Sequence, residues 1–341
     1  MKTICICGGG HLGHVVGGYI ATKKENIVNI LTNHPENWSN NLEITLPNNE
    51  TITGNLNIVT NDASKVIPQA DIVFICLPGP YIRKEIEKIK PYLRPSTAVG
   101  TVVSNTGFFF QTHDLIPTQP TFGFQRVPFI ARTIEYGHKA HLRSFRKELY
   151  MVVENANNFA MGGGREQLHR SLESLLDTPI TLLDNYLEVS LTNSNGLLHT
   201  SRMYSMWKDY HEGVYYPTQP LLYEDWTIEA AQLYIDMDNE LQELLKVIGV
   251  RKGVVPPVLE YYESNDAESL CHKLQSIPSF KGIKSPMVQT PYGYIPDLAS
   301  RYFTEDINYS LYYIYASTHR HNIPSPTIDQ VYHWGKRVLE E

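Results

Sequence analysis

The sequence predicts an α/β protein in which an N-terminal domain with a Rossmann-type parallel sheet is followed by an all-α C-terminal domain. Strand-type and helix-type segments alternate over the first half, which is typical of a parallel sheet with helices on its faces. Long segments with helical periodicity replace them after about Thr181. We place the two domains at 1–181 and 182–341, since 341 residues exceed one ordinary core.

The first element is a short apolar run of strand type, Thr3–Cys7, which ends in a glycine-rich turn, residues 8–13, that reads G-x-G-x-x-G. Apolar residues at helical spacing follow it, so the motif has the strand, turn and helix that a dinucleotide fingerprint requires. A glycine-rich turn without a ligand is the alternative. We expect the cofactor's pyrophosphate to lie against this turn and the start of the helix, where backbone N–H groups and the helix dipole favour an anion. The residues predicted to bind there are Gly8, Gly10, His11, Leu12 and Gly13.

Further strands are predicted at Ile27–Leu31, Asp71–Leu77 and Thr97–Val103, with a polar hairpin insertion at Ile52–Thr60 and a helix at Arg83–Tyr92. Ligands of parallel sheets bind beyond the carboxyl ends of the strands. The loop at the end of Asp71–Leu77 should therefore line the cofactor cleft, although it could equally be a plain strand terminator. Its residues are Leu77, Pro78 and Gly79.

The end of the second strand bears on the choice of cofactor. NAD sites usually place a carboxylate there for the ribose diol, but this chain has Leu31-Thr32-Asn33-His34. Thr32 and Asn33 could hydrogen-bond a 2′-phosphate, although no arginine is near them in the sequence to neutralise it. We therefore expect NADP, and NAD stays possible.

Composition excludes several other classes of protein. A formal net charge of −7 and a pI near 6.0 argue against a nucleic-acid binder. No secretory segment and no apolar run of about eighteen residues is present, so we expect no membrane partner and a cytoplasmic location. The four cysteines lack CxxC spacing, which predicts buried free thiols and no metal site. Apolar surface on the helical domain would make a homodimer possible.

Helices of the second domain are predicted at Glu188–Lys208, Thr227–Ile248, Ala267–Gln275, Ile307–Arg320 and Thr327–Leu339. On the first of them, Asn195 and His199 are four residues apart, so their side chains share one face and could meet the same substrate oxygen. Aromatic side chains after this pair could line a substrate pocket, and core packing would explain them equally well. They are Tyr204, Trp207, Tyr210, Tyr215, Tyr216, Tyr223 and Trp226.

The order of these elements resembles the opine dehydrogenase family, also described as octopine/nopaline dehydrogenases, whose C-terminal domain is of the 6-phosphogluconate-dehydrogenase type. The resemblance covers most of the chain. It rests on the N-terminal glycine fingerprint, on Asn195-Gly-Leu-Leu-His199, on Arg301-Tyr-Phe-Thr-Glu-Asp306, and on Ile323-Pro-Ser-Pro-Thr-Ile328 before the last helix.

By this resemblance, His199 is the acid/base that polarises the carbonyl of a 2-oxo acid, and Asp306 pairs with it. A carboxylate on one ring nitrogen fixes the tautomer and stabilises the imidazolium. Asn195 would hold the substrate near the nicotinamide, and Arg301 would clamp a substrate carboxylate with both arms of its guanidinium. Asp306 could instead cap the helix predicted to begin at Ile307.

The reaction that the resemblance implies is reductive condensation: an amino acid adds to a 2-oxo acid and the imine is reduced at the expense of NAD(P)H. One alternative is a 2-oxo-acid reductase of the ketopantoate type, in which no amine takes part. Those relatives usually depend on a helix lysine, whereas Lys208 lies more than two turns beyond His199. The other alternative is a non-catalytic NAD(P)-binding redox sensor, which would need the glycine turn and not His199.

Overall fold

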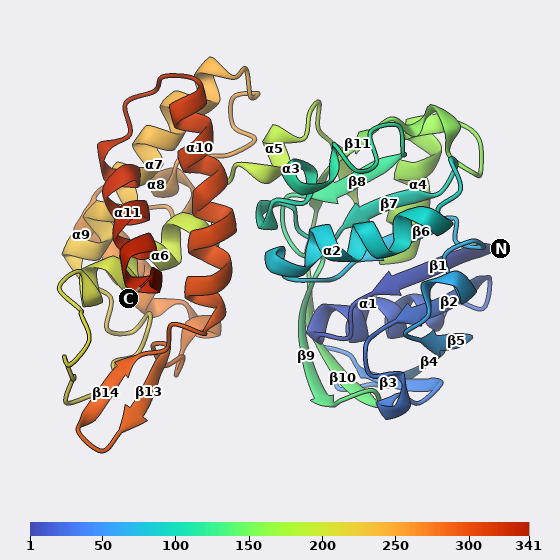
Figure 1. The fold of residues 1–341 in the computed structure, drawn as a ribbon, viewed down its shortest axis with the longest axis horizontal. Coiled ribbons are helices and arrows are strands. Elements are labelled where there is room, and N and C mark those ends of the chain that lie inside the picture. The colour runs from blue at the N-terminus through green and yellow to red at the C-terminus, as the bar shows by residue number, and fades with distance from the viewer. Residues whose placement is uncertain (341) are drawn as a thin grey trace. The chain divides into compact units, whose positions relative to one another are not determined.

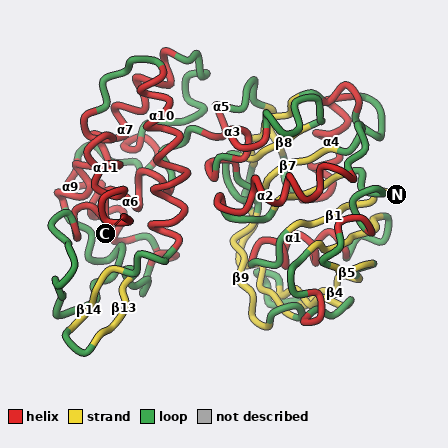
Figure 2. The backbone as a smooth tube through the Cα atoms, viewed as in Figure 1, coloured by secondary structure: helices red, strands yellow, loops and turns green. Residues whose placement is uncertain are grey.

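The computed structural model describes residues 1–340 and divides into two compact units, Met1–Ser190 and Leu191–Glu341. Strands dominate the first unit and helices the second (Figure 1, Figure 2). The division follows Ser190 and not Thr181. The reason is that the strand Ile180–Leu182 pairs with Leu149–Glu154 in the sheet of the first unit, which keeps the chain in that unit beyond the boundary expected from sequence.

Among the described residues, the first unit is built on an eight-stranded sheet of order β12-β11-β8-β7-β6-β1-β2-β5. Neighbouring strands are parallel, except that β11 runs antiparallel to β8. The bounds are β1 Lys2–Cys7, β2 Asn26–Leu31, β5 Ile58–Thr60, β6 Ile72–Ile75, β7 Ala98–Thr101, β8 Thr121–Phe124, β11 Leu149–Glu154 and β12 Ile180–Leu182. The predicted parallel sheet is confirmed.

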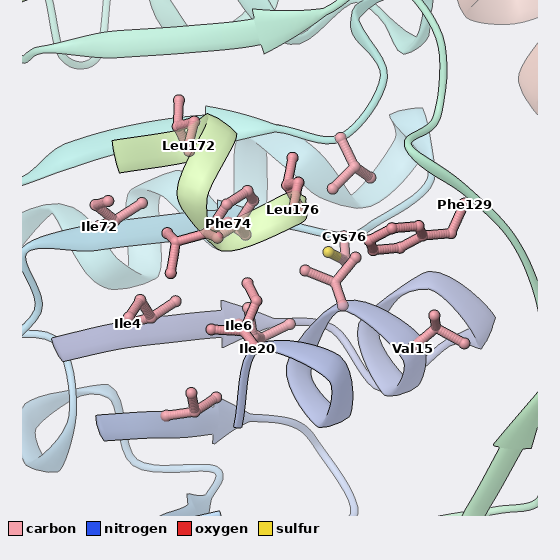
Figure 3. Close-up of a cluster of buried hydrophobic side chains, with 14 of the residues drawn as sticks. Ile4, Ile6, Val15, Ile20, Ile72, Phe74, Cys76, Phe129, Leu172 and Leu176 are labelled. Atoms are coloured by element: carbon pink, nitrogen blue, oxygen red, sulfur yellow. The ribbon is translucent and has the colours of Figure 1, made fainter. Parts of the chain in front are cut away.

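The helices of this unit are α1 His11–Ala21, α2 Gly79–Ile89, α3 Phe108–Thr112, α4 Gly164–Leu176 and the short α5 Leu187–Ser190. Because side chains alternate along a strand, Ile4 and Ile6 of β1 share one face, and they join one core with residues of α1 and α4 (Figure 3). Phe74 of β6 lies in the same cluster. Strands β6, β7 and β8 are buried over their whole length, and so are the last four residues of β1, which explains why these strands are mostly apolar.

A second sheet of order β4-β3-β10-β9 accompanies the first. Its strands are β3 Asn41–Thr45, β4 Thr51–Asn55, β9 Phe129–Glu135 and β10 Lys139–Phe145. The predicted hairpin at Ile52–Thr60 is therefore wrong. β4 pairs with β3 in the second sheet, whereas β5 lies at the edge of the main sheet and pairs with β2.

The second unit is mainly helical, with α6 Asn195–Trp207, α7 Ile228–Val247, α8 Val258–Tyr261, α9 Ala267–Ser276, a π-helix at Tyr302–Leu311, α10 Tyr312–Arg320 and α11 Pro326–Glu340. One hairpin, β13 Met287–Thr290 with β14 Gly293–Pro296, departs from the all-α expectation. A buried cluster joins α6, the π-helix and α11 around Trp207 and Phe303. No helix within residues 1–340 has the length and apolar character needed to cross a bilayer.

Two helix predictions need correction. The expected helix Glu188–Lys208 is two helices, α5 and α6, with a break at residues 191–194, so Asn195 begins a helix. The helix expected from Ile307 starts earlier, as a π-helix at Tyr302, so Asp306 lies inside a helical turn and does not cap one. π-helical turns are rare and occur frequently at functional sites.

Candidate active site

The glycine turn is shaped by contacts that exclude side chains. Gly8 has φ +119°, and a Cβ there would lie 2.6 Å from the carbonyl oxygen of Cys76. A Cβ on Gly13 would lie 1.9 Å from the carbonyl oxygen of Gly8. Gly10 differs, because a Cβ built on it meets nothing within 4 Å. The turn therefore closes on itself at Gly8 and Gly13 and leaves open space beside Gly10, where a ligand could approach the backbone.

The start of α1 suits an anion. Gly10 is its N-cap and offers no side-chain cap, and the first turn carries no acidic residue. The N–H groups at a helix start that no side chain caps, together with the helix dipole, bind phosphate groups. His11, Leu12 and Gly13 form this first turn, so the helix begins within the glycine turn expected at residues 8–13 and not after it. The residues thus fit the pyrophosphate of a dinucleotide, on the evidence of the open space beside Gly10.

A buried histidine fastens this turn to the second sheet. His14 Nδ1 lies 2.9 Å from the carbonyl oxygen of Gly10, and its Nε2 accepts the N–H of Gly137 at 2.7 Å. The ring stacks on Trp38 at 4.2 Å between centroids. Burial lowers the pKa of His14, so the neutral ring that both bonds require is favoured. Sequence reasoning missed this role, because nothing local to His14 shows that residue 137 is its partner.

The other predicted cofactor residues differ in exposure, and Thr32 and Leu77 are the ones among them that lie against the turn. Thr32 follows β2, is buried, and its hydroxyl lies 3.4 Å from that of Tyr136, whereas Asn33 is exposed. Leu77 meets the turn, since its Cδ2 lies 2.9 Å from a Cβ built on Gly8. Pro78 is the N-cap of α2, and Gly79 is the first residue of that helix.

The second unit brings together the two residues predicted as an acid/base pair. His199 Nδ1 lies 2.7 Å from Asp306 Oδ2, and the two residues are 8% and 7% exposed. His199 comes from α6 and Asp306 from the π-helix, 107 residues later in the chain. Gly196 permits this approach, because a Cβ on it would lie 2.7 Å from the Cβ of Ser310. The glycine that follows Asn195 is therefore required for steric reasons.

The other nitrogen of His199 meets a tyrosine. Nε2 lies 2.8 Å from the Tyr223 hydroxyl, and the ring of Tyr302 packs edge-on against the imidazole at 4.7 Å. A carboxylate accepts hydrogen bonds, so Nδ1 carries the proton and Nε2 accepts the hydroxyl of Tyr223. Sequence reasoning placed Tyr223 among seven aromatic candidates and could not single it out.

Asn195 and Arg301 differ from this buried pair. Asn195, the first residue of α6, is exposed one turn before His199. The Arg301 side chain is 72% exposed and forms an ion pair with the buried carboxylate of Glu305, to which its Nε donates at 2.6 Å. The predicted bidentate clamp thus already engages Glu305 of its own helix, and a substrate would meet the solvent-facing side of the guanidinium.

The arrangement can move protons. A histidine whose tautomer is fixed by a buried carboxylate can take or give a proton at its other nitrogen. Within residues 1–340, no group of three His, Cys, Asp or Glu side chains is placed to hold a metal ion. The four cysteines are all buried and free, as predicted.

Comparison with known families agrees with both halves of this description. Residues 182–339 match the model of the NAD/NADP octopine/nopaline dehydrogenase α-helical domain, and residues 4–105 match that of ketopantoate reductase PanE/ApbA. An opine dehydrogenase from Haliotis discus hannai is 27% identical over 99% of this chain and 90% of its own length. An octopine dehydrogenase from Pecten maximus is 24% identical over 98% and 90%.

Solved structures share the fold across the whole chain. A structure of octopine dehydrogenase with NADH and L-arginine superposes with a TM-score of 0.86 at 22% identity, covering 99% of this chain and 89% of that one. Yersinopine dehydrogenase bound to NADP⁺ gives 0.74 at 10% identity, covering 100% and 91%. The helical domain match and the full-length relatives agree with the glycine turn and the His–Asp pair. The chain belongs to the opine dehydrogenase family of nicotinamide-dependent oxidoreductases.

Proposed function

We propose that this protein catalyses the reductive condensation of a 2-oxo acid with the amino group of an amino acid, at the expense of NAD(P)H. The observation that carries the proposal is the buried bond from His199 Nδ1 to Asp306 Oδ2 at 2.7 Å, within the helical domain that matches the family. Relatives of known activity include an opine dehydrogenase and a tauropine dehydrogenase. Octopine dehydrogenase has been solved with L-arginine and with pyruvate, an amino acid and a 2-oxo acid.

The residues of this chain would act as follows. Protonated His199, stabilised by Asp306, helps the carbonyl oxygen leave as water once the amine has added, and general acid catalysis of this kind contributes about 10²–10⁴-fold. Asn195, the exposed first residue of α6, orients the oxo acid, and the solvent-facing side of Arg301 attracts a substrate carboxylate. When bound, the reduced nicotinamide supplies the hydride for the imine carbon.

The glycine turn would hold the cofactor in the first unit. Gly8 and Gly13 keep the turn closed, Gly10 leaves room for the pyrophosphate, and the N–H groups at the start of α1 face its charge. Leu77 borders the turn and contributes apolar contact, and Pro78 and Gly79 follow it at the start of α2.

We further propose NADP as the preferred form, with NAD as the second choice. No carboxylate stands at Thr32 or Asn33, which removes the usual partner of the ribose diol. Fluorescence titration tests this preference: we expect NADPH to bind more tightly than NADH, and tighter binding of NADH would contradict it.

Purified protein tests the proposed reaction directly. Oxidation of NADPH or NADH is followed with pyruvate, 2-oxoglutarate or oxaloacetate, each with and without a panel of amino acids. Oxidation that needs both substrates and disappears in His199→Ala supports the proposal. His319→Ala is the matched control, because His319 also pairs with an aspartate, Asp329, at 3.0 Å on the exposed surface.

A simple 2-oxo-acid reductase is the second candidate, favoured by the ketopantoate reductase match of residues 4–105. It predicts turnover with the oxo acid alone. A redox sensor predicts tight cofactor binding without turnover, unchanged in His199→Ala. A homodimer and a cytoplasmic location stay predictions, and light scattering of the purified protein tests the first.

A further inference from the structure

Both nitrogens of His199 have partners in this structure. Nδ1 is bonded to Asp306, and Nε2 lies 2.8 Å from the Tyr223 hydroxyl. Nε2 is the atom that must exchange a proton with the substrate if Asp306 holds the other nitrogen. A substrate therefore reaches the histidine either by displacing the Tyr223 hydroxyl or by bonding to it.

The ring of Tyr223 stacks on two neighbouring aromatic rings, which argues against displacement. It stacks on Phe280 at 3.9 Å between centroids and on Trp226 at 5.9 Å, with interplanar angles of 15° and 8°. Tyr223 is 4% exposed. Moving this ring would open two stacked contacts and expose buried apolar surface, which costs free energy.

Hydrogen bonds also hold the backbone beside Tyr223 in place. The N–H of Leu222 donates to the carbonyl oxygen of Ile283 at 2.7 Å, and its carbonyl oxygen accepts Arg202 Nε at 3.1 Å. Arg202 is buried on α6 one turn after His199, and its guanidinium also lies over the Trp226 ring. The helix that carries the histidine thus also fixes the segment that carries Tyr223.

We propose that Tyr223 is a catalytic residue whose hydroxyl passes the proton between His199 Nε2 and the substrate. This proposal rests on the proposed function. In the direction of reduction, the Tyr223 O–H donates its proton to the departing substrate oxygen while the Nε2–H of protonated His199 gives its proton to the phenolic oxygen. One O–H bond, one N–H bond and the substrate's C–O bond break, two O–H bonds form, and the lone pair of the substrate nitrogen forms the C=N bond as water leaves. Tyr223 is unchanged at the end, and His199 is left neutral beside Asp306.

The environment of the hydroxyl suits this role. Burial raises the pKa of Tyr223 well above its ordinary value, so the phenol keeps its proton at neutral pH. The transfer is then concerted through a neutral hydroxyl and needs no phenolate. The same chain of hydrogen bonds serves the reverse reaction, with His199 as the final proton acceptor.

The test compares Tyr223→Phe with Tyr234→Phe. Both substitutions remove one buried hydroxyl from the second unit, and the Tyr234 hydroxyl donates to the carbonyl oxygen of Asn193 at 2.5 Å. Phe keeps the stacked ring at position 223, so both variants should melt at similar temperatures. We expect Tyr223→Phe to lower kcat by about 10²–10⁴-fold with the KM for the cofactor unchanged. Tyr234→Phe should keep the wild-type kcat.

A second variant carries 3-fluorotyrosine at position 223, which retains the hydroxyl and the stack and should restore most of the turnover. A wild-type kcat in Tyr223→Phe, while His199→Ala is inactive, would overturn the relay and leave the proposed function standing. A lower KM for the oxo acid in Tyr223→Phe would also overturn it, since the hydroxyl would then only occupy the substrate's place. No turnover by the wild-type protein with any substrate pair would remove the proposed function itself.

Discussion

Replacing Asp306 by Asn keeps the size and the hydrogen-bonding reach of the side chain and removes its charge. The carboxylate lies 2.7 Å from His199 Nδ1 and is 7% exposed, so little solvent would compensate for the lost charge. An amide can also donate to Nδ1, which would favour the tautomer with its proton on Nε2. Both effects act on the protonated histidine that the proposed reaction uses.

The size of the effect follows from the geometry. With the two charges centred about 4 Å apart and an effective dielectric constant of about 20, the pair is worth about 4 kcal/mol, which corresponds to about 10³-fold in rate. The change of tautomer adds to this loss, and replacing the aspartate of a Ser-His-Asp triad by Asn lowers kcat by about 10⁴-fold for that reason. We therefore expect Asp306→Asn to lower kcat by about 10³–10⁴-fold.

The assay is steady-state oxidation of NADPH with saturating oxo acid and amino acid. Circular dichroism melting of the same protein separates lost catalysis from lost folding. Asp329→Asn is the matched control, because it removes a carboxylate from the exposed pair with His319 in the same unit, and it should keep the wild-type rate. A kcat for Asp306→Asn near the wild-type value would refute the reasoning that His199 acts through its charged partner.

Four further predictions concern residues around the two sites. Gly10→Ala should leave the melting temperature unchanged and weaken cofactor binding in titrations, because its Cβ meets no protein atom within 4 Å. Gly13→Ala should instead lower the melting temperature, since its Cβ would lie 1.9 Å from a backbone oxygen; equal stability of the two variants would contradict this. Gly196→Ala should lower kcat by forcing α6 away from the π-helix, and an active variant would show that the close approach is dispensable. Burial lowers the pKa of His14 from its ordinary 6.5, so as the pH falls the unfolded chain binds a proton at this histidine before the folded chain does. The stability that depends on neutral His14 should therefore be complete above about pH 6.5 and lost as the pH falls through the lowered pKa. Thermal melts across this range should show the loss, and the same dependence in His14→Gln would exclude His14 as its source.

The parts of this protein that depend on local chemistry could be predicted from its sequence. The glycine turn could be predicted because a strand, a tight turn and a helix start require particular residues within thirteen positions. The link between His199 and Asp306 came from resemblance and not from spacing, since 107 residues separate them. Their 2.7 Å contact confirms the pairing and removes the alternative that Asp306 caps a helix.

The missed features depend on tertiary contacts. The π-helix begins at Tyr302, but periodicity placed a helix start at Ile307, because a widened turn shifts the apolar positions that a 3.6-residue period would match. Nothing in the local sequence shows that His14 meets Gly137, or that Tyr223 reaches His199 from a loop. Such partners are defined only when the chain is folded.

The most direct test of the central claim is the fate of a labelled hydride. The protein is incubated with C4-deuterated NADPH, a 2-oxo acid and an amino acid, and the products are analysed by mass spectrometry. We predict a secondary amine with the mass of both substrates joined less one oxygen, and with one deuterium on the former carbonyl carbon. Deuterium found only in a 2-hydroxy acid, at a rate that is independent of the amino acid, would contradict reductive condensation and identify a simple reductase.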